Sequence, residues 1–128
     1  MSEIRANTVS NAAGTGPVTL TGQYAAKAWV NFQGNNTVTI RDSGNVSSVT
    51  DNGTGDYTIN FSSSFADANY CTCSIGGYSQ AIWGSDHLVH LNSSTAPTGS
   101  LVRIANSYVY GTQTGLYDNF ILNVLITR

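Results

Sequence analysis

The sequence predicts an all-β fold, an antiparallel β-sandwich of jelly-roll type. Apolar and polar residues alternate in short runs, as in strands with one buried face, and the clearest runs are 26–32 and 57–61. Clusters of Gly, Asn, Asp and Ser separate the runs and favour turns. No segment keeps an apolar period of 3.6 residues with caps over three turns, so no helix is expected. The 128 residues suffice for one such domain.

The first two strands are expected at 26–32 and 37–41, on either side of a Gly-Asn-Asn turn. In the first of them, Ala28, Val30 and Phe32 share one face, because successive side chains of a strand point to opposite faces. This face is predicted to point into the core, and the alternate residues of the strand then face outward.

A β-hairpin is the clearest local prediction. Its loop, at 51–55, consists of residues that tolerate positive φ angles. Alternating apolar side chains flank the loop on both arms, and those expected in the core are Val46, Val49, Tyr57, Ile59 and Phe61.

The second half of the chain contains further short apolar runs between turn-forming clusters. They predict strands at 70–75, 81–83, 87–91, 100–104, 107–110 and 119–126. The last run is almost continuously apolar, which is typical of a strand covered on both faces. In a domain this small, a neighbouring subunit can supply the second covering layer.

Residues 1–24 differ from the rest and are predicted to form an extended N-terminal arm, followed by a β-sandwich head at 25–128. The breaker cluster at 11–17 interrupts the arm, and only a short alternating run around Val18 and Leu20 follows it. An extended segment of this kind can add a strand to an exposed sheet edge of another protein.

The surface is expected to be polar but almost uncharged. Only 9% of the residues are charged, against roughly 25% in ordinary soluble domains, and Ser, Thr, Asn and Gly take their place. Interface cores are depleted in charge, so this composition favours a homo-oligomer that leaves little surface per subunit. A turn-rich β-protein explains the same composition without an oligomer.

Charge and hydropathy argue against two classes of partner. The net charge is −2 and the five basic residues are scattered, whereas phosphate binding needs clustered Lys and Arg. No apolar run approaches the roughly 20 residues needed to cross a bilayer, and the first residues lack the apolar core of a signal peptide. We therefore expect no nucleic-acid partner, no membrane insertion and no export by the general secretory route.

The two cysteines, Cys71 and Cys73, lie on the same face of a predicted strand. A disulfide between them would be strained, because bridged cysteines normally lie on well-separated backbone segments. In the reducing cytoplasm we expect them to be free, buried thiols that act as small apolar side chains.

The candidate catalytic and metal-binding groups do not form a site. Ser85, Asp86 and His87 are consecutive, so on a strand they point alternately to opposite sides and cannot form a catalytic relay. His87 and His90 lie on opposite faces, so only copies around a symmetry axis could share a metal through them. Segment 51–56 is rich in oxygen atoms but lacks the bidentate Glu of a calcium loop, and no carboxylate pair suits glycoside hydrolysis. We expect no enzymatic activity, no metal and no cofactor.

The remaining chemistry is aromatic. Tyr and Trp residues of the second half lie beside glycines, and such rings stack on the apolar faces of sugars while Asp and His bind hydroxyl groups. Filling the core is the alternative role for these rings. The candidate ligand-binding residues are Tyr78, Trp83, Asp86, His87, Tyr110 and Tyr117, with Tyr108 in the same aromatic group.

Three stretches resemble the distal head domain of tail fibres from marine and cyanobacterial tailed phages. They are 26–32 (AKAWVNF), 46–61 (VSSVTDNGTGDYTINF) and 119–128 (NFILNVLITR). The arm, at 4–22 (IRANTVSNAAGTGPVTLTG), is similar to a segment that recurs in phage fibres. The resemblance covers most of the chain, is densest over 24–70 and includes no catalytic motif.

This resemblance implies a homotrimeric virion protein that binds a glycan or an outer-membrane receptor on the host surface, and whose N-terminal arm contacts other tail or virion proteins. Tail fibres are usually long, whereas this head begins shortly after Met1. The expectation is thus a small stand-alone virion protein or a separately encoded tip. Two alternatives stay open: a capsid or neck decoration protein that serves assembly only, and a cytoplasmic lectin unrelated to phages.

Overall fold

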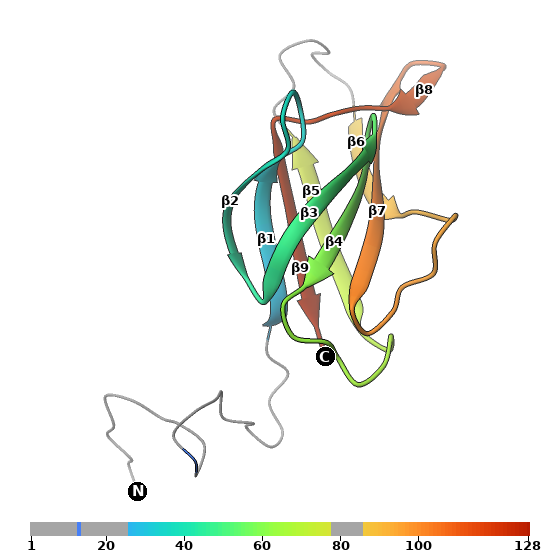
Figure 1. Ribbon diagram of the computed structural model, residues 1–128. Coiled ribbons are helices and arrows are strands. Elements are labelled where there is room, and N and C mark those ends of the chain that lie inside the picture. The colour runs from blue at the N-terminus through green and yellow to red at the C-terminus, as the bar shows by residue number, and fades with distance from the viewer. Residues whose placement is uncertain (1–12, 14–25, 78–85) are drawn as a thin grey trace, which may run out of the picture.

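The computed structural model describes residue 13 and residues 26–77 and 86–128 (Figure 1). These residues form strands and no helix, as the alternating pattern predicts. The strands are β1 (Ala26–Gln33), β2 (Thr39–Gly44), β3 (Val46–Gly53), β4 (Asp56–Phe61), β5 (Cys71–Gly77), β6 (Asp86–Leu91), β7 (Leu101–Tyr110), β8 (Gln113–Leu116) and β9 (Ile121–Thr127). The predicted arm, except residue 13, and the predicted strand at 81–83 lie outside the described residues, so the boundary between arm and head stays a prediction.

The strands form two antiparallel sheets, which we call the β1–β9 sheet and the β4–β7 sheet. The first has the order β2-β1-β9-β5, and the second has the order β3-β4-β7-β6, with β8 added to the far end of β7. Figure 1 shows them as two layers, with β3, β4 and β7 in front of β1, β9 and β5. This sandwich-like arrangement confirms the all-β, antiparallel part of the prediction, while the jelly-roll topology stays a prediction.

The core lies between the two sheets and follows the period of two. Ala28, Val30 and Phe32 of β1 are buried, as predicted, and pair across the sheet with buried residues of β9. The opposite layer contributes Tyr57 and Ile59 of β4, and the ring of Tyr57 meets Phe32 edge to face at 5.2 Å between centroids. Burying these side chains away from water is the main force that holds the two layers together.

The predicted hairpin is present, but its loop is shorter than 51–55. Strand β3 continues to Gly53, which pairs with Asp56, so only Thr54 and Gly55 remain in the turn. A side chain on Gly55 would collide with the backbone of Asn106 and Tyr117, and its φ of 65° also favours glycine. The tight turn therefore depends on a tertiary contact as well as on local turn preference.

The prediction of separate strands at 100–104 and 107–110 is wrong, because β7 runs unbroken through both. The polar Asn106 interrupts the apolar pattern, yet it is fully buried and pairs in register with Val89 of β6.

Strand β8 was not predicted, because its residues do not alternate between apolar and polar. It forms by pairing with the end of β7 across a turn in which Gly111 has a φ of 58°.

The last strand, β9, was predicted to be covered on both faces, but the described residues of the chain cover only one of them. Leu122, Val124 and Ile126 of β9 are buried, but Leu125 on the other face is 42% exposed. Cys71 and Cys73 are free thiols, as predicted, but both are exposed, so the prediction that they are buried is wrong. The reason is register, because in β5 the cysteines point outward with Ile75 while the polar alternate residues face the core.

Among the described residues, no helix is long and apolar enough to span a lipid bilayer.

Candidate functional site

Three rings form a cluster at the end of the molecule where β6 begins and β7 ends. His87 of β6 lies directly opposite Tyr108 of β7 in the sheet. Tyr117, in the segment after β8, packs against both, with ring centroids 5.9 Å from His87 and 6.1 Å from Tyr108. We call these three residues the aromatic cluster.

The predicted site residues reach this end of the molecule in part. His87 and Tyr117 are brought together, although 29 positions separate them in the sequence. Asp86 begins β6 opposite Val109, and Tyr110 lies at the tip of the β7–β8 hairpin, where its side chain is 53% exposed. Tyr78 and Trp83 lie outside the described residues.

Tyr108 belongs to the cluster, although the sequence placed it only in the wider aromatic group. Its ring lies over Gly115 of β8, where an added side chain would approach it to 3.0 Å. The lack of a side chain at Gly115 thus lets the Tyr108 ring pack closely on β8. Because β8 was not predicted from the sequence, neither was this role of Tyr108.

Tyr117 is held in place by two buried amide side chains. The Asn106 side-chain amide donates a hydrogen bond to the carbonyl of Tyr117, and the Asn106 carbonyl accepts one from the Tyr117 backbone N–H at 3.0 Å. The amide of Asn119 donates to Oδ1 of Asn106 at 3.2 Å. Oδ1 of Asn119 has no hydrogen-bond partner among the described residues, but the other hydrogen bonds of the two amides restrain the backbone on both sides of the Tyr117 ring.

The carboxylate of Asp118 attaches the segment after β8, which carries Tyr117, to the β3–β4 turn. Oδ1 of Asp118 accepts hydrogen bonds from the Tyr57 hydroxyl and from the backbone N–H of Gly55, each at 2.6 Å. Burial of the Tyr57 ring, followed by its bond to Asp118, raises the pKa of the phenol far above its usual range, so the phenol remains a proton donor. These hydrogen bonds therefore attach the segment that carries Tyr117 to the buried ring of Tyr57 and to the β3–β4 turn.

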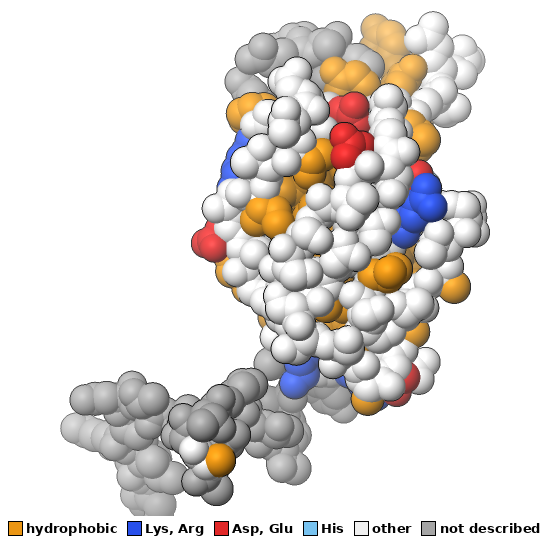
Figure 2. Space-filling view, viewed as in Figure 1, with side chains coloured by type: hydrophobic (Ala, Val, Ile, Leu, Met, Phe, Trp, Pro, Cys, Tyr) orange, Lys and Arg blue, Asp and Glu red, His pale blue; other side chains and the backbone are white. Residues whose placement is uncertain are grey.

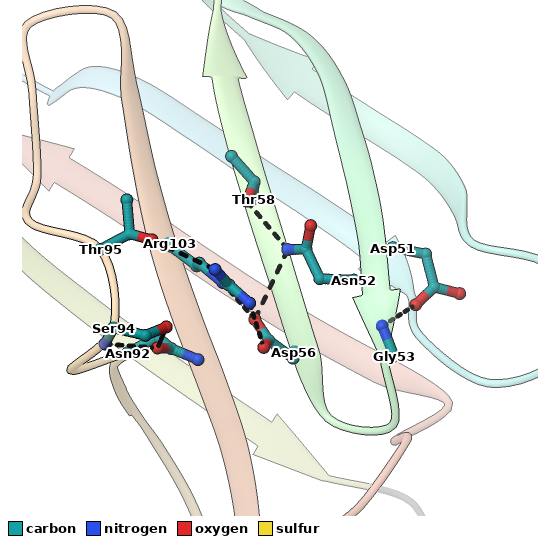
Figure 3. Close-up of polar contacts among 9 residues, drawn as sticks. All are labelled: Asp51, Asn52, Gly53, Asp56, Thr58, Asn92, Ser94, Thr95 and Arg103. Carbon is teal, nitrogen blue, oxygen red and sulfur yellow. Dashed lines mark hydrogen bonds and ion pairs between the residues drawn. The ribbon is translucent and has the colours of Figure 1, made fainter.

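A polar network lies on the outer face of the β4–β7 sheet (Figure 3). The guanidinium of Arg103 donates two hydrogen bonds to the carboxylate of Asp56, at 2.8 and 2.7 Å, and a third to Thr95 at 3.1 Å. From β3, Asn52 donates to Thr58 at 2.9 Å. These contacts link β3, β4, β7 and the loop after β6, so the simplest role of the network is to hold that loop against the sheet.

Replacing Asp56 by Asn is expected to weaken the acid sensitivity of the fold. The hydrogen bonds from Arg103 hold the pKa of the Asp56 carboxyl below its usual value of 3.8. Because this pKa is lower in the folded than in the unfolded chain, the ion pair stabilises the fold above about pH 4, and this contribution is lost as the pH falls below 3.8. Urea unfolding at neutral pH and at about pH 3 should show a smaller fall in stability for Asp56→Asn than for the wild type.

Asp51→Asn is the control, because the carboxylate of Asp51 accepts a local hydrogen bond from the backbone of Gly53, at 2.9 Å, and pairs with no basic side chain among the described residues. An Asp56→Asn variant that loses as much stability in acid as Asp51→Asn would contradict the assignment.

A shallow groove of about 250 Å³ lies next to this network. It is lined by residues from β6, β7, β8 and the loop after β6: His90, Leu91, Asn92, Ser93, Ala105 and Leu116. Imidazole, amide and hydroxyl groups above an apolar floor suit a small polar ligand. Sequence reasoning missed this groove, because only the pairing of β6 and β8 with β7 brings its residues together.

The side chains considered for metal binding lie apart or are engaged in other contacts. His87 and His90 lie on opposite faces of β6, as predicted from their spacing. Asp56 is engaged by Arg103, and Asp51 accepts a hydrogen bond from the backbone of Gly53 at 2.9 Å. Within residues 26–77 and 86–128, no group of three or more His, Cys, Asp or Glu side chains is placed to hold a metal ion.

The geometry of the aromatic cluster suits binding by stacking and hydrogen bonding. Comparison of the chain with protein-family models, with curated proteins and with solved structures finds no significant match.

Proposed function

We propose that the protein is a structural component of a tailed-phage virion, a tail-fibre or tail-tip head that binds the host cell surface through the aromatic end of the β4–β7 sheet. The observation that supports binding at this end is the aromatic cluster, together with the exposed Tyr110 on the adjoining hairpin. The connection with phages rests on the sequence resemblance at 26–32, 46–61 and 119–128.

Rigid tyrosines are suited to glycan recognition, because a ring held in place loses little conformational entropy when a sugar stacks on it. The hydrogen bonds of Asn106 and Asp118 provide that rigidity. A host glycan is therefore the receptor class that this end of the molecule fits best.

Tyr110→Ala is expected to weaken binding to host envelopes by about 10-fold, since loss of one aromatic anchor typically costs 1–2 kcal/mol. The measurement is saturation binding of labelled protein to a panel of cyanobacterial and marine bacterial cells, followed by a glycan array. The control is Thr50→Ala, an exposed residue of β3. Unchanged binding by Tyr110→Ala and by Tyr117→Ala would place the receptor site elsewhere.

A capsid or neck decoration protein is the second candidate. It is favoured by the exposed apolar side chains on the outer face of the β1–β9 sheet, which suit a permanent contact, with another virion protein or with a second copy of the chain, better than reversible recognition. Binding to phage capsids with no binding to any cell envelope would support decoration and contradict host attachment.

A further inference from the structure

The outer face of the β1–β9 sheet carries a continuous apolar surface. Trp29 of β1, Leu125 of β9 and Cys73 of β5 are paired neighbours across three strands, so they form one row. Ile75, two residues along β5, is 67% exposed, and Leu125 and Trp29 are 42% and 37% exposed. We call Trp29, Cys73, Ile75 and Leu125 the apolar face.

The apolar face is hollowed into a shallow groove of about 300 Å³. The indole of Trp29 lies over Gly44 of β2, where any side chain would collide with it. In this region, the amide of Asn31 donates a hydrogen bond to Oδ1 of Asn123 at 2.5 Å. Part of the hydrogen-bonding capacity of these two side chains is thus already used within the sheet, which lowers the cost of covering them.

The charges of this sheet lie around the apolar face rather than on it. Lys27 precedes Trp29 by two residues on β1, while Asp42 of β2 lies opposite Asn31, two residues after Trp29. A positive and a negative side chain thus flank the central row, one on each side along the strands. An apolar centre with a charged rim is the usual anatomy of a protein interface.

The outer surface of β3 and β4 differs in kind from the apolar face, although the β6–β8 end of the same sheet also exposes apolar side chains, namely Leu88, Leu91, Val109 and Leu116. Figure 2 views the molecule from the side of β3 and β4, where few side chains are charged and most of the visible surface is neither charged nor apolar. There, Asn60 donates hydrogen bonds to Ser48 and Thr50, at 3.0 and 3.1 Å, so this surface is polar and suited to water. Within the described residues, the central row of the β1–β9 sheet consists of Trp29, Leu125 and Cys73 and carries no amide or hydroxyl side chain.

We propose that a second copy of this chain packs on the apolar face, with its strands reversed about a two-fold axis that runs along the row of Trp29, Leu125 and Cys73. Rotation about this axis places Trp29, Leu125 and Cys73 of one copy against the same three residues of the other. It also brings Lys27 of each copy close to Asp42 of the other, which pairs the rim charges. The low charge of the whole chain fits a surface that is buried against itself.

The first test is the mass of the protein in solution, measured by light scattering after size exclusion, for the wild type, Ile75→Lys and Leu88→Lys. Leu88 is the matched control, because it is an apolar strand residue that is 58% exposed on the other sheet. The wild type and Leu88→Lys are expected at twice 13.5 kDa, and Ile75→Lys at 13.5 kDa. A monomeric wild type, a mass of three chains, or an Ile75→Lys variant that keeps the dimer mass would overturn the proposal.

The second test does not depend on how Ile75→Lys folds. In a Cys71→Ser variant, the remaining Cys73 lies on the proposed axis, so a short bismaleimide should join two chains. In the matched Cys73→Ser variant, Cys71 lies two residues from the axis along β5, and cross-linking is expected to be at least about 5-fold weaker. Equal cross-linking of the two variants, or none, would contradict the two-fold arrangement.

The proposed two-fold contact takes the place of the trimer that the resemblance to tail fibres implies, and it is separate from the surface proposed for host binding. Ile75→Lys is expected to abolish the dimer while each chain keeps its aromatic cluster, and Tyr110→Ala is expected to weaken cell binding while the dimer remains. Failure of one proposal is thus distinguishable from failure of the other.

Discussion

Phe32→Ala is expected to lower the free energy of unfolding by about 3–5 kcal/mol. The ring of Phe32 is completely buried between the two layers, opposite Leu122 of β9 and edge to face with Tyr57. Truncation removes its transfer from water and leaves a cavity that packed neighbours on both sheets cannot fill. Urea unfolding followed by circular dichroism measures the change.

Phe120→Ala is the matched control for this substitution. Phe120 is 37% exposed, and its ring lies under the guanidinium of Arg41 at 4.4 Å. Loss of a partly exposed cation–π contact should cost about 1 kcal/mol or less. Similar losses for the two variants would mean that the core is not centred on the contact between Phe32 and Tyr57.

Asn106→Ala is expected to lower the free energy of unfolding by about 2–4 kcal/mol and to weaken host binding as much as Tyr117→Ala does. The substitution leaves the partly buried Tyr117 carbonyl without its side-chain donor and the buried amide of Asn119 without its acceptor. Each such unpaired group costs about 1–3 kcal/mol, and the segment that carries Tyr117 loses its attachment to β7.

The control is Asn60→Ala, which also removes two side-chain hydrogen bonds, but on the solvent-facing side of β3 and β4. Water can replace those bonds, so the expected loss of stability is below about 1 kcal/mol. If Asn106→Ala were as stable as Asn60→Ala, the buried amide network would not be what holds Tyr117 in place.

Predictions from the sequence were correct where the alternation of apolar and polar residues within one segment defines both the strand and its buried face. Alternation in 26–32 and 57–61 correctly predicted β1, β4 and the residues that they bury. It failed at Asn106, since an amide inside an apolar pattern predicts a strand end, whereas hydrogen bonds from distant segments allow β7 to continue. It also failed for the burial of Cys71 and Cys73, because a period of two shows which residues share a face but not which face is inward.

The candidate site was predictable only as a set of residue types. The aromatic content of the second half and the opposite orientation of His87 and His90 follow from the sequence alone. The contact between His87 and Tyr117, the inclusion of Tyr108 and the groove beside His90 do not, because they require β6 and β8 to flank β7.

By itself the sequence determined that the chain forms antiparallel strands, which residues of β1, β4 and β9 share a face, and that the surface carries little charge. These are properties of the period of two and of composition, and each can be read from neighbouring residues. Tertiary structure alone decided the strand order, the burial of Asn106 and Asn119, and the alignment of Trp29, Leu125 and Cys73 in one exposed row. The physical reason is that strand pairing between distant segments sets the register, and the register decides which side chains become neighbours.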